Sequence, residues 1–407
     1  MYGSVATLNS KLRILQVVSA YYPAVRYGGP IRSVHGLSVA LARRGHDVHV
    51  YTTTLDGASD LDVPVDQPMD LEGVRVHYFR VPMCRRLAWA PGLKARLRES
   101  IRDFDAVHIH AVYLWPMVAA AREAARAGIP YVMAPRGMLI REAINRKSRW
   151  TKTAWIHLLE RKSLANASAV HVTADIEAAE LRSLGLPAPH VTCIPNGVEA
   201  PREFESLSAG PFRDLPQSYV LFLSRINWKK GLDRLITAWQ SLRGVPLVIA
   251  GNDEDGYENK LKEQVRSMGL TETIRFLGPI EDAHKWALYK EARLFVLPSY
   301  TENFGNVVAE AMAMGCPVAV TPEVGIASMV RATGAGIVVD GAPREFSRAV
   351  SALLADPARL RDMASRGRTA ARELLSWDAV AASAETLYRE VIDERLTPEP
   401  VRAEQPT

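Results

Sequence analysis

The stretch SYVLFLSRINWKKGLDRLITAWQSLRGVPLVIAG, residues 218–251, contains a complete strand–helix–strand unit. Its first part, 218–225, is almost continuously apolar, which is typical of a parallel strand that is buried on both faces. The part 230–242 predicts a helix, and 245–251 predicts the next strand. This order of elements is the building block of an α/β protein with a parallel sheet.

The same alternation continues downstream and also occurs upstream. Helices are predicted at 257–268, 281–291 and 306–314, each followed by an apolar strand. At the other end of the sequence, LRILQVVSA (12–20) predicts a buried strand that feeds a helix. A loop rich in proline and glycine, 195–217, separates the two halves. The sequence therefore predicts two Rossmann-like, doubly wound parallel-sheet domains facing each other across a cleft.

We expect an N-terminal domain over residues 1–205 and a C-terminal domain over 206–385. Residues 386–407 are expected to form the end of a closing helix and a frayed tail, because LTPEPVRAEQPT has three prolines and little to bury. A chain of 407 residues with 48% hydrophobic and 23% charged residues has the composition of a globular protein. A chain of this length is too long for one ordinary hydrophobic core, which favours two domains.

The composition also bears on localisation. No stretch approaches the roughly 18 uninterrupted apolar residues that a spanning helix needs. The start, MYGSVATLNSKLRILQ, lacks the apolar block of a secretion signal, and the three cysteines lie far apart. We expect a soluble protein in the reducing cytoplasm, with a peripheral position on the inner face of the cell membrane as the alternative.

The positive charge is concentrated in one segment. Residues 141–162 contain seven cationic and two acidic residues, so the segment has a net charge of +5. This value equals the net charge of the whole chain. This segment interleaves its cations with Trp150 and Trp155. We hypothesise that it meets an anionic membrane face or a lipid-diphosphate acceptor, because peripheral binding combines basic charge with aromatic anchors. A solvated basic helix face remains an equal alternative, and nucleic acid is not expected.

Ligands of open parallel sheets collect beyond the carboxyl ends of the strands. There, ENFGNVVAE (302–310) runs from the strand RLFVLP into a helix. Gly305 permits close backbone approach, and the first helical amides can face an anion. Glu310 is suited to bind the vicinal hydroxyls of a ribose, and Glu302 those of a hexose. Both could instead be ordinary acids that complement a helix dipole.

A second group, SRINWKKG (224–231), follows the first strand of the C-terminal domain. Arg225 and Lys230 are fixed cations that could neutralise a departing diphosphate without Mg²⁺. The alternative is a solvated basic turn.

Two weaker groups lie in the N-terminal half. Gly28 and Gly29 precede the first helix and could admit a phosphate or a sugar, although a simple turn is equally compatible. His108 and His110 share one face of a strand, and one of them could bind a sugar hydroxyl. A buried core histidine is the commoner case. Two Asp-x-Asp patterns, at 60–62 and 253–255, lie in polar loops, so no metal site is expected.

Taken together, these groups resemble the retaining glycosyltransferases of the two-domain GT-B fold, family 4 (glycosyl transferases group 1). The resemblance spans Leu12 to about Leu396. It is most specific in the Glu-x-Phe-Gly-x4-Glu run at 302–310, with support from Arg-x4-Lys-Gly at 225–231 and IPNGV at 194–198. The stretch PRGML (135–139) and the basic segment resemble members that assemble bacterial surface polysaccharides.

The resemblance implies transfer of a hexose, with retention, from a UDP- or GDP-sugar to a sugar or a lipid-linked saccharide, in exopolysaccharide or lipopolysaccharide synthesis. It implies no cofactor and no metal. It implies catalytic roles for His110, Glu302, Arg225 and Lys230. The implied donor-binding residues are Gly28, Gly29, Arg225, Lys230, Glu302, Phe304, Gly305, Asn306 and Glu310. The implied acceptor-side residues are Arg136 and Arg141.

One departure from the family pattern follows the strand CPVAVTP. Many relatives have Gly-Gly-x-x-Glu there, whereas this chain reads VGIASM from Val324 to Met329. A donor contact made by that acid is therefore in doubt. A sugar-nucleotide epimerase and a non-catalytic sugar-nucleotide-binding protein remain alternatives. A dehydrogenase is disfavoured by the missing GxGxxG fingerprint.

Overall fold

The computed structural model describes residues 10–24, 29–65, 67–141, 144, 149–201, 212, 214–253, 256–280 and 282–396. The chain forms two compact units. The first consists of Met1–Val172, Glu177–Ile194 and Val380–Thr407, and the second of Thr173–Ile176 and Pro195–Ala379. The boundary expected near residue 205 lies outside the described residues.

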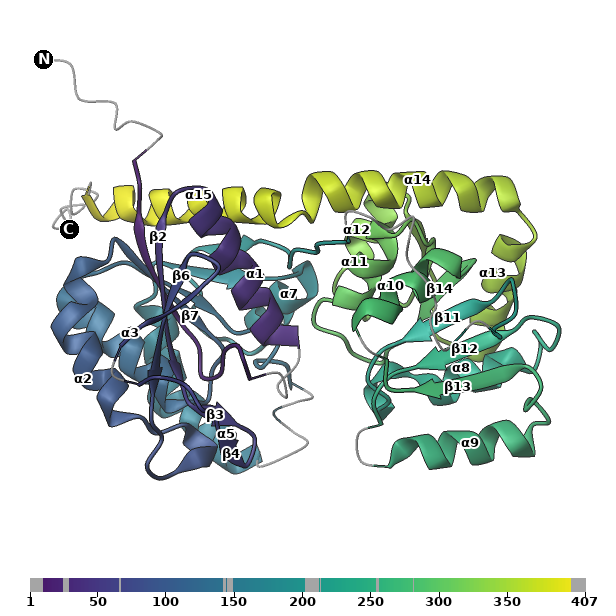
Figure 1. Cartoon of the computed structure of the whole chain (residues 1–407), viewed down its shortest axis with the longest axis horizontal. Coiled ribbons are helices and arrows are strands. Elements are labelled where there is room, and N and C mark those ends of the chain that lie inside the picture. The colour runs from purple at the N-terminus through teal and green to yellow at the C-terminus, as the bar shows by residue number, and fades with distance from the viewer. Residues whose placement is uncertain are drawn as a thin grey trace, which may run out of the picture. The chain divides into compact units, whose positions relative to one another are not determined.

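The strands of the first unit form one sheet in the order β10-β9-β8-β7-β1-β2-β6-β5. Three of them, β2, β6 and β7, are labelled in Figure 1. All neighbouring pairs are parallel except β5 with β6. The central strand β1 has four buried residues out of five, as expected for a strand that is covered on both faces. The strands are β1 (Arg13–Val17), β2 (Asp47–Thr53), β5 (Met69–Leu71), β6 (Val74–Phe79), β7 (Ala106–His110), β8 (Tyr131–Ala134), β9 (Ala169–Val172) and β10 (Val191–Cys193), with a separate ribbon of β3 (Leu55–Asp56) and β4 (Ser59–Asp60).

The helices of the first unit begin and end where the sequence provides suitable residues. The helix α3 (Trp115–Ala127) has Pro116 in its first turn and ends at Gly128, whose φ is 67°. The remaining helices are α1 (Gly29–Arg43), α2 (Pro91–Ser100), α5 (Arg149–Trp155), α6 (Arg161–Ala165), α7 (Asp175–Ser183) and α15 (Trp377–Leu396), with 3₁₀ turns at Arg85–Leu87 and Ile101–Asp103 and a π-helical turn at Ile156–Glu160.

The second unit has a fully parallel sheet in the order β13-β12-β11-β14-β15-β16. Its strands are β11 (Val220–Leu223), β12 (Leu247–Ala250), β13 (Ile274–Gly278), β14 (Leu294–Leu297), β15 (Val318–Val320) and β16 (Gly336–Val338). Its helices are α8 (Leu232–Trp239), α9 (Tyr257–Ser267), α10 (Asp282–Glu291), α11 (Asn306–Ala313), α12 (Ala327–Thr333), α13 (Pro343–Leu354) and α14 (Pro357–Leu374), with a 3₁₀ turn at Trp228–Lys230. The predicted α/β class, with a parallel sheet in each of two domains, is confirmed.

The last helix differs from the prediction. It was expected to belong to the C-terminal domain up to residue 385, but α15 belongs to the first unit from Val380 onward. The reason is its buried face, where Tyr388 is fully enclosed and donates or accepts hydrogen bonds with Gln16 and His108 of the first sheet.

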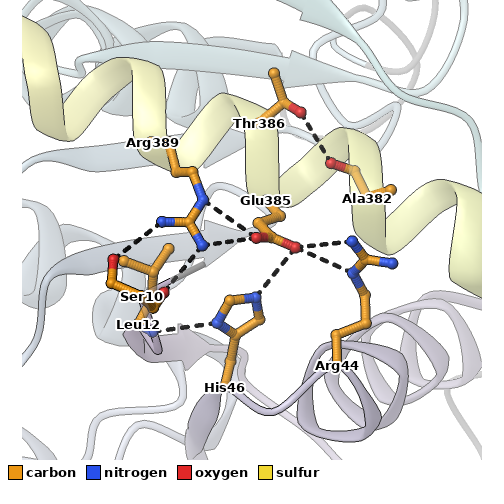
Figure 2. Close-up of polar contacts among 8 residues, drawn as sticks. All are labelled: Ser10, Leu12, Arg44, His46, Ala382, Glu385, Thr386 and Arg389. Carbon is orange, nitrogen blue, oxygen red and sulfur yellow. Dashed lines mark hydrogen bonds and ion pairs between the residues drawn. The ribbon is translucent and has the colours of Figure 1, made fainter. Parts of the chain in front are cut away.

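Charged side chains add to the attachment of α15, as Figure 2 shows. The Glu385 carboxylate accepts from Arg389 of its own helix and from Arg44 and His46 of the first unit. Burial alone would raise the pKa of Glu385, but these three donors outweigh it and lower the pKa to about 2. The carboxylate therefore stays ionised and binds α15 to the first sheet at neutral pH.

Both sheets have a point where the strand order reverses. In the first unit it lies between β1 and β7, and in the second between β11 and β14. At such a point the loops that follow two neighbouring strands diverge and leave room for a ligand. Most of the predicted site residues follow these four strands, whereas Arg136 and Arg141 follow β8.

Candidate active site

Two loops meet at the switch point of the second unit. After β11, Asn227 caps a short 3₁₀ turn by accepting from the Lys229 amide at 3.1 Å. After β14, the Tyr300 amide donates to the Lys229 carbonyl at 2.7 Å. A Cβ on Gly231 would lie 1.9 Å from the Pro298 carbonyl oxygen, so only glycine permits this approach. The two loops are therefore held together by their backbones.

This approach brings together two residues predicted from the sequence, Lys230 and Glu302. The ammonium of Lys230 forms an ion pair with Oε2 of Glu302, and the side chains are only 9% and 19% exposed. Arg225, on the same loop as Lys230, has an exposed side chain. The site thus contains one enclosed cation that is held by a carboxylate and a second cation open to solvent.

Glu302 is held in turn by the chain that follows β15. Its amide donates to the Glu323 carbonyl at 3.0 Å, and its carbonyl accepts from Gly325 at 2.9 Å. A Cβ on Gly325 would lie 1.9 Å from the Asn303 carbonyl oxygen. The segment that departs from the family pattern therefore supports Glu302 through its backbone. Its side chains Val324 and Ile326 are buried and apolar, so they supply no acid.

The next residues lead into α11. Phe304 is buried, and Gly305 has a φ of 98°, which favours glycine. Asn306 is the first residue of α11, and its side-chain oxygen accepts from Asn196 at 3.0 Å. The predicted residues 302–306 thus form one ordered turn at the start of a helix.

Glu310 lies one turn into α11 and is bound by two residues that the sequence analysis did not single out. Lys285 donates to Oε1 of Glu310 at 2.7 Å, and Tyr289 donates to Oε2 at 3.1 Å. Both donors come from α10, four residues apart and therefore on one face. Burial, followed by the charge of Glu310, raises the pKa of Tyr289 well above its usual value, so this hydroxyl remains a donor. The i, i+4 spacing of Lys285 and Tyr289 was a usable signal in the sequence.

The switch point of the first unit contains His110, the last residue of β7. Both His108 and His110 are buried, with ring centroids 4.1 Å apart. His110 accepts or donates at both ring nitrogens, with Gln16 Oε1 at 2.6 Å and Arg136 Nη2 at 3.1 Å. Burial, followed by the charge of Arg136, lowers the pKa of His110 well below its usual value. His110 is therefore neutral at physiological pH.

Arg136 follows β8 and lies beside His110. Burial lowers the pKa of Arg136 to about 10, partly offset by the nearby Glu177 carboxylate, so the guanidinium is charged at neutral pH. Arg141 lies farther along the same loop and donates to the Ser183 carbonyl at 2.6 Å. Gly29 is the first residue of α1, whereas Gly28 lies outside the described residues.

The basic segment is only partly described, since 142–143 and 145–148 are not. Trp150 is 84% exposed and Leu158 is 74% exposed. Trp155, in contrast, turns inward and donates to Oε1 of Glu160 at 2.8 Å. Glu160 is fully buried, and burial raises its pKa despite donors from Tyr113 and Trp155. The two tryptophans that the sequence could not distinguish therefore lie in opposite surroundings.

Neither a cluster of metal ligands nor a membrane-spanning helix occurs in the described part of the chain. Within the described ranges, no group of three or more His, Cys, Asp or Glu residues is arranged to hold a metal ion. Asp60 forms an ion pair with Arg85 at 3.0 Å, and Asp253 accepts from the Glu258 amide at 3.2 Å. Among the helices that the structure describes, none combines the length and apolarity needed to cross a membrane.

The structure resembles solved glycosyltransferases over most of its length. Sucrose-phosphate synthase from Thermosynechococcus elongatus aligns with a TM-score of 0.74 and 22% identity, covering 94% of this chain and 100% of that chain. HepE from Anabaena, solved in complex with UDP-glucose, aligns with a TM-score of 0.68 and 21% identity, covering 93% and 100%. These alignments show that the chain has the two-domain GT-B fold.

Sequence comparison places the chain more narrowly. The profile for glycosyl transferases group 1 matches residues 204–370, and that for a glycosyl transferase 4-like domain matches residues 28–197. A glycogen synthase of Mycobacterium tuberculosis is 30% identical over 413 residues, covering 93% of this chain and 94% of that protein. The chain therefore belongs to the group 1 glycosyltransferases of family 4.

Proposed function

We propose that this glycosyltransferase moves a hexose, with retention, from a nucleotide-diphosphate sugar to a saccharide acceptor without a metal ion. The observation that carries the proposal is the enclosed Lys230–Glu302 pair at the switch point of the second sheet, with the exposed Arg225 on the same loop as Lys230. UDP-glucose bound to Anabaena HepE supports a UDP-sugar as the first donor to test.

The two cations suit the charge that develops during transfer. The bond between the anomeric carbon and the diphosphate oxygen breaks, and its electron pair remains on the leaving oxygen. Lys230 and Arg225 stabilise this charge more in the transition state than in the bound donor. The acceptor hydroxyl adds to the same face of the sugar, and its proton passes to the leaving phosphate. This front-face course accounts for retention.

The carboxylates bind the two ends of the donor. Each oxygen of Glu310 accepts one hydrogen bond from α10 and retains a second lone pair for a ribose hydroxyl. Glu302 binds the hexose hydroxyls while it remains paired with Lys230. The first amides of α11 add donors to the diphosphate.

The test is transfer from a panel of UDP-, GDP- and ADP-sugars, with the anomeric configuration of the product read by NMR. A donor at 100 times its Kd should stabilise the protein by about 2.7 kcal/mol, which thermal unfolding detects. Full turnover by a Lys230→Ala, Glu310→Ala double variant would contradict the proposal. Conversion of the donor to an epimer without an acceptor would support an epimerase, and binding without any turnover a non-catalytic sugar-nucleotide-binding protein.

For the acceptor, we propose a lipid-linked saccharide reached at an anionic membrane face, in exopolysaccharide or lipopolysaccharide synthesis. The exposed Trp150 and Leu158 lie on the basic segment together with exposed Arg161 and Lys162. Apolar side chains among cations are suited to the headgroup boundary of an anionic bilayer.

Flotation with vesicles that contain anionic lipid tests this membrane proposal. We expect the wild type to float and Trp150→Ala, Leu158→Ala to remain in the bottom fraction. Leu374→Ala is the matched control, because Leu374 is also exposed but lies on α14, outside the basic segment. Equal flotation of all three proteins, or of none, would refute the membrane proposal and leave the donor chemistry untouched.

A further inference from the structure

The first unit contains a chain of six hydrogen bonds in which every proton position is determined. It runs from Arg136 through His110, Gln16, Tyr388, His108 and His171 to the Ile194 carbonyl. All six bonds lie between 2.6 and 3.2 Å. The four intermediate side chains and His171 are buried, so no water competes for them.

One end of the chain is determined by a carbonyl, which can only accept. His171 therefore donates from Nε2 to Ile194 at 2.8 Å, and in a neutral ring its Nδ1 must accept. His108 donates from Nε2 to that nitrogen at 3.2 Å, which leaves its own Nδ1 as an acceptor. The Tyr388 hydroxyl consequently donates to His108 at 2.7 Å.

The other end is determined by a cation, which can only donate. Arg136 donates to Nδ1 of His110 at 3.1 Å, so the proton of the neutral His110 ring lies on Nε2. That nitrogen donates to Oε1 of Gln16 at 2.6 Å, which sets the orientation of the amide. The amide nitrogen then donates to the Tyr388 oxygen at 3.2 Å. The two halves of this chain of hydrogen bonds meet at the Tyr388 hydroxyl, which donates to His108 and accepts from Gln16.

This geometry has a consequence for His110. Its two ring nitrogens are both hydrogen-bonded inside the first unit, one to Gln16 and one to Arg136. Arg136, whose guanidinium has further donors, lies at the outer end of the chain. Its φ of 56° is unusual for a residue other than glycine, and Ala111 and Tyr113 after the neighbouring strand share this feature. Such backbone strain clusters at functional sites.

We propose that Tyr388 and Gln16 are positioning residues that set the tautomer of His110, and that His110 thereby holds the Arg136 guanidinium at the carboxyl end of β8 for the acceptor or the transferred sugar. The role of Arg136 in sugar transfer rests on the proposed function, whereas the tautomer of His110 does not depend on it.

The test is Tyr388→Phe, with the proton positions read by two-bond ¹H–¹⁵N NMR of histidine-labelled protein. The wild type should show His110 protonated at Nε2 alone, with its signals assigned by their loss in His110→Asn. In Tyr388→Phe the Gln16 amide loses its acceptor and can reverse. Its nitrogen then faces Nε2 of His110, which must accept, so a population protonated at Nδ1 appears and Arg136 loses its acceptor.

Transfer rates complete the test. We expect kcat of Tyr388→Phe to fall by about 10–100-fold, by analogy with the loss of a partner that orients a metal-binding histidine. The matched control is Tyr131→Phe, which removes a buried hydroxyl bonded at 2.6 Å to the Ser163 carbonyl. Gln16→Glu in the Tyr388→Phe background should restore both the tautomer and part of kcat, because a carboxylate can only accept from Nε2.

Two outcomes would overturn the inference. One is a His110 that stays entirely protonated at Nε2 in Tyr388→Phe, and the other is a kcat no lower than that of Tyr131→Phe. Failure of the wild type to transfer any sugar would instead count against the proposed function, because the NMR result needs no substrate.

Discussion

The switch points of the two units differ in their electrostatics, because one consists of ion pairs and the other of neutral rings that end at the Arg136 cation. In the second unit, Lys230–Glu302 and Lys285–Glu310 are largely enclosed ion pairs. In the first unit, three buried histidines have lowered pKa values and are joined through neutral hydrogen-bonding groups. A site of fixed charges can respond to a developing anion, whereas a site of neutral rings can set geometry without attracting a counter-ion. Under the proposed function, one unit stabilises the leaving group and the other orients the partner.

The largest effect that tests this comparison is the acid sensitivity of the first unit. Burial is the main cause that lowers the pKa of His171 to about 3 and of His49 and His77 to about 4. Unfolding exposes these rings, whose ordinary pKa is about 6.5, so the unfolded state binds more protons below that pH. Stability should be full above pH 6.5 and fall as the pH decreases, by roughly 1.4 kcal/mol per pH unit for each proton taken up.

Denaturant unfolding followed between pH 7 and pH 4.5 measures this slope. We expect His171→Asn to reduce the slope of the free energy of unfolding against pH by about 1.4 kcal/mol per pH unit, which corresponds to one proton. A free energy of unfolding that is constant between pH 6.5 and 5 would show that the histidines are not held neutral.

The next effect concerns the charged unit. Lys230→Ala should lower kcat by about 10²–10³, by analogy with the loss of one preorganised oxyanion donor. The control is Lys229→Ala, because the neighbouring side chain is exposed and only its backbone joins the two loops. Steady-state transfer rates distinguish the two variants. Equal rates would mean that the enclosed ammonium does not contact the leaving group.

A smaller effect is expected at Glu310. Glu310→Gln should raise the Kd of a nucleoside diphosphate about tenfold, since a neutral amide replaces the carboxylate bound by Lys285 and accepts ribose hydroxyls less strongly. Calorimetric titration measures it. Glu258→Gln breaks an ion pair with Lys262 on α9 and should leave the Kd unchanged. An unchanged Kd for Glu310→Gln as well would place the ribose elsewhere.

The smallest effect concerns the attachment of α15. Glu385→Gln should lower the free energy of unfolding by about 1–2 kcal/mol at pH 7, because three cationic or N–H donors lose a charged acceptor. Glu385 has a lowered pKa, so its contribution is full above about pH 4.5 and is lost as the pH falls towards 2. The difference from wild type should therefore shrink in acid. A difference that is independent of pH would contradict the assignment.

The sequence placed Lys230 and Glu302 in the loops that follow two neighbouring strands, β11 and β14. Neighbouring parallel strands end at one edge of the sheet, and these two side chains form an ion pair there. Glu310 lies on α11 and is bound by Lys285 and Tyr289, a pairing that the strand ends did not indicate. The family and the GT-B fold were confirmed, whereas the roles given to all the site residues, Lys230, Glu302 and Glu310 among them, stay predictions.

What the sequence could not predict is the long-range polar pairing. Tyr388 contacts Gln16 and His108 across 372 and 280 residues, and nothing local marks a tyrosine in a terminal helix as their partner. The direction of Trp155 was likewise undecided, because it depends on the buried Glu160 in the π-helical turn. Such pairings are set by tertiary packing and not by spacing.

The course of α15 has a consequence for the order of folding during synthesis. The second unit lies almost wholly within Pro195–Ala379, so its chain is complete before the last helix leaves the ribosome. The first unit must wait, because until Tyr388 and Glu385 have emerged the amide of Gln16 and the rings of His46 and His108 lack partners from α15. The half of the protein that is translated first is therefore the half that finishes folding last, an inversion of the usual order.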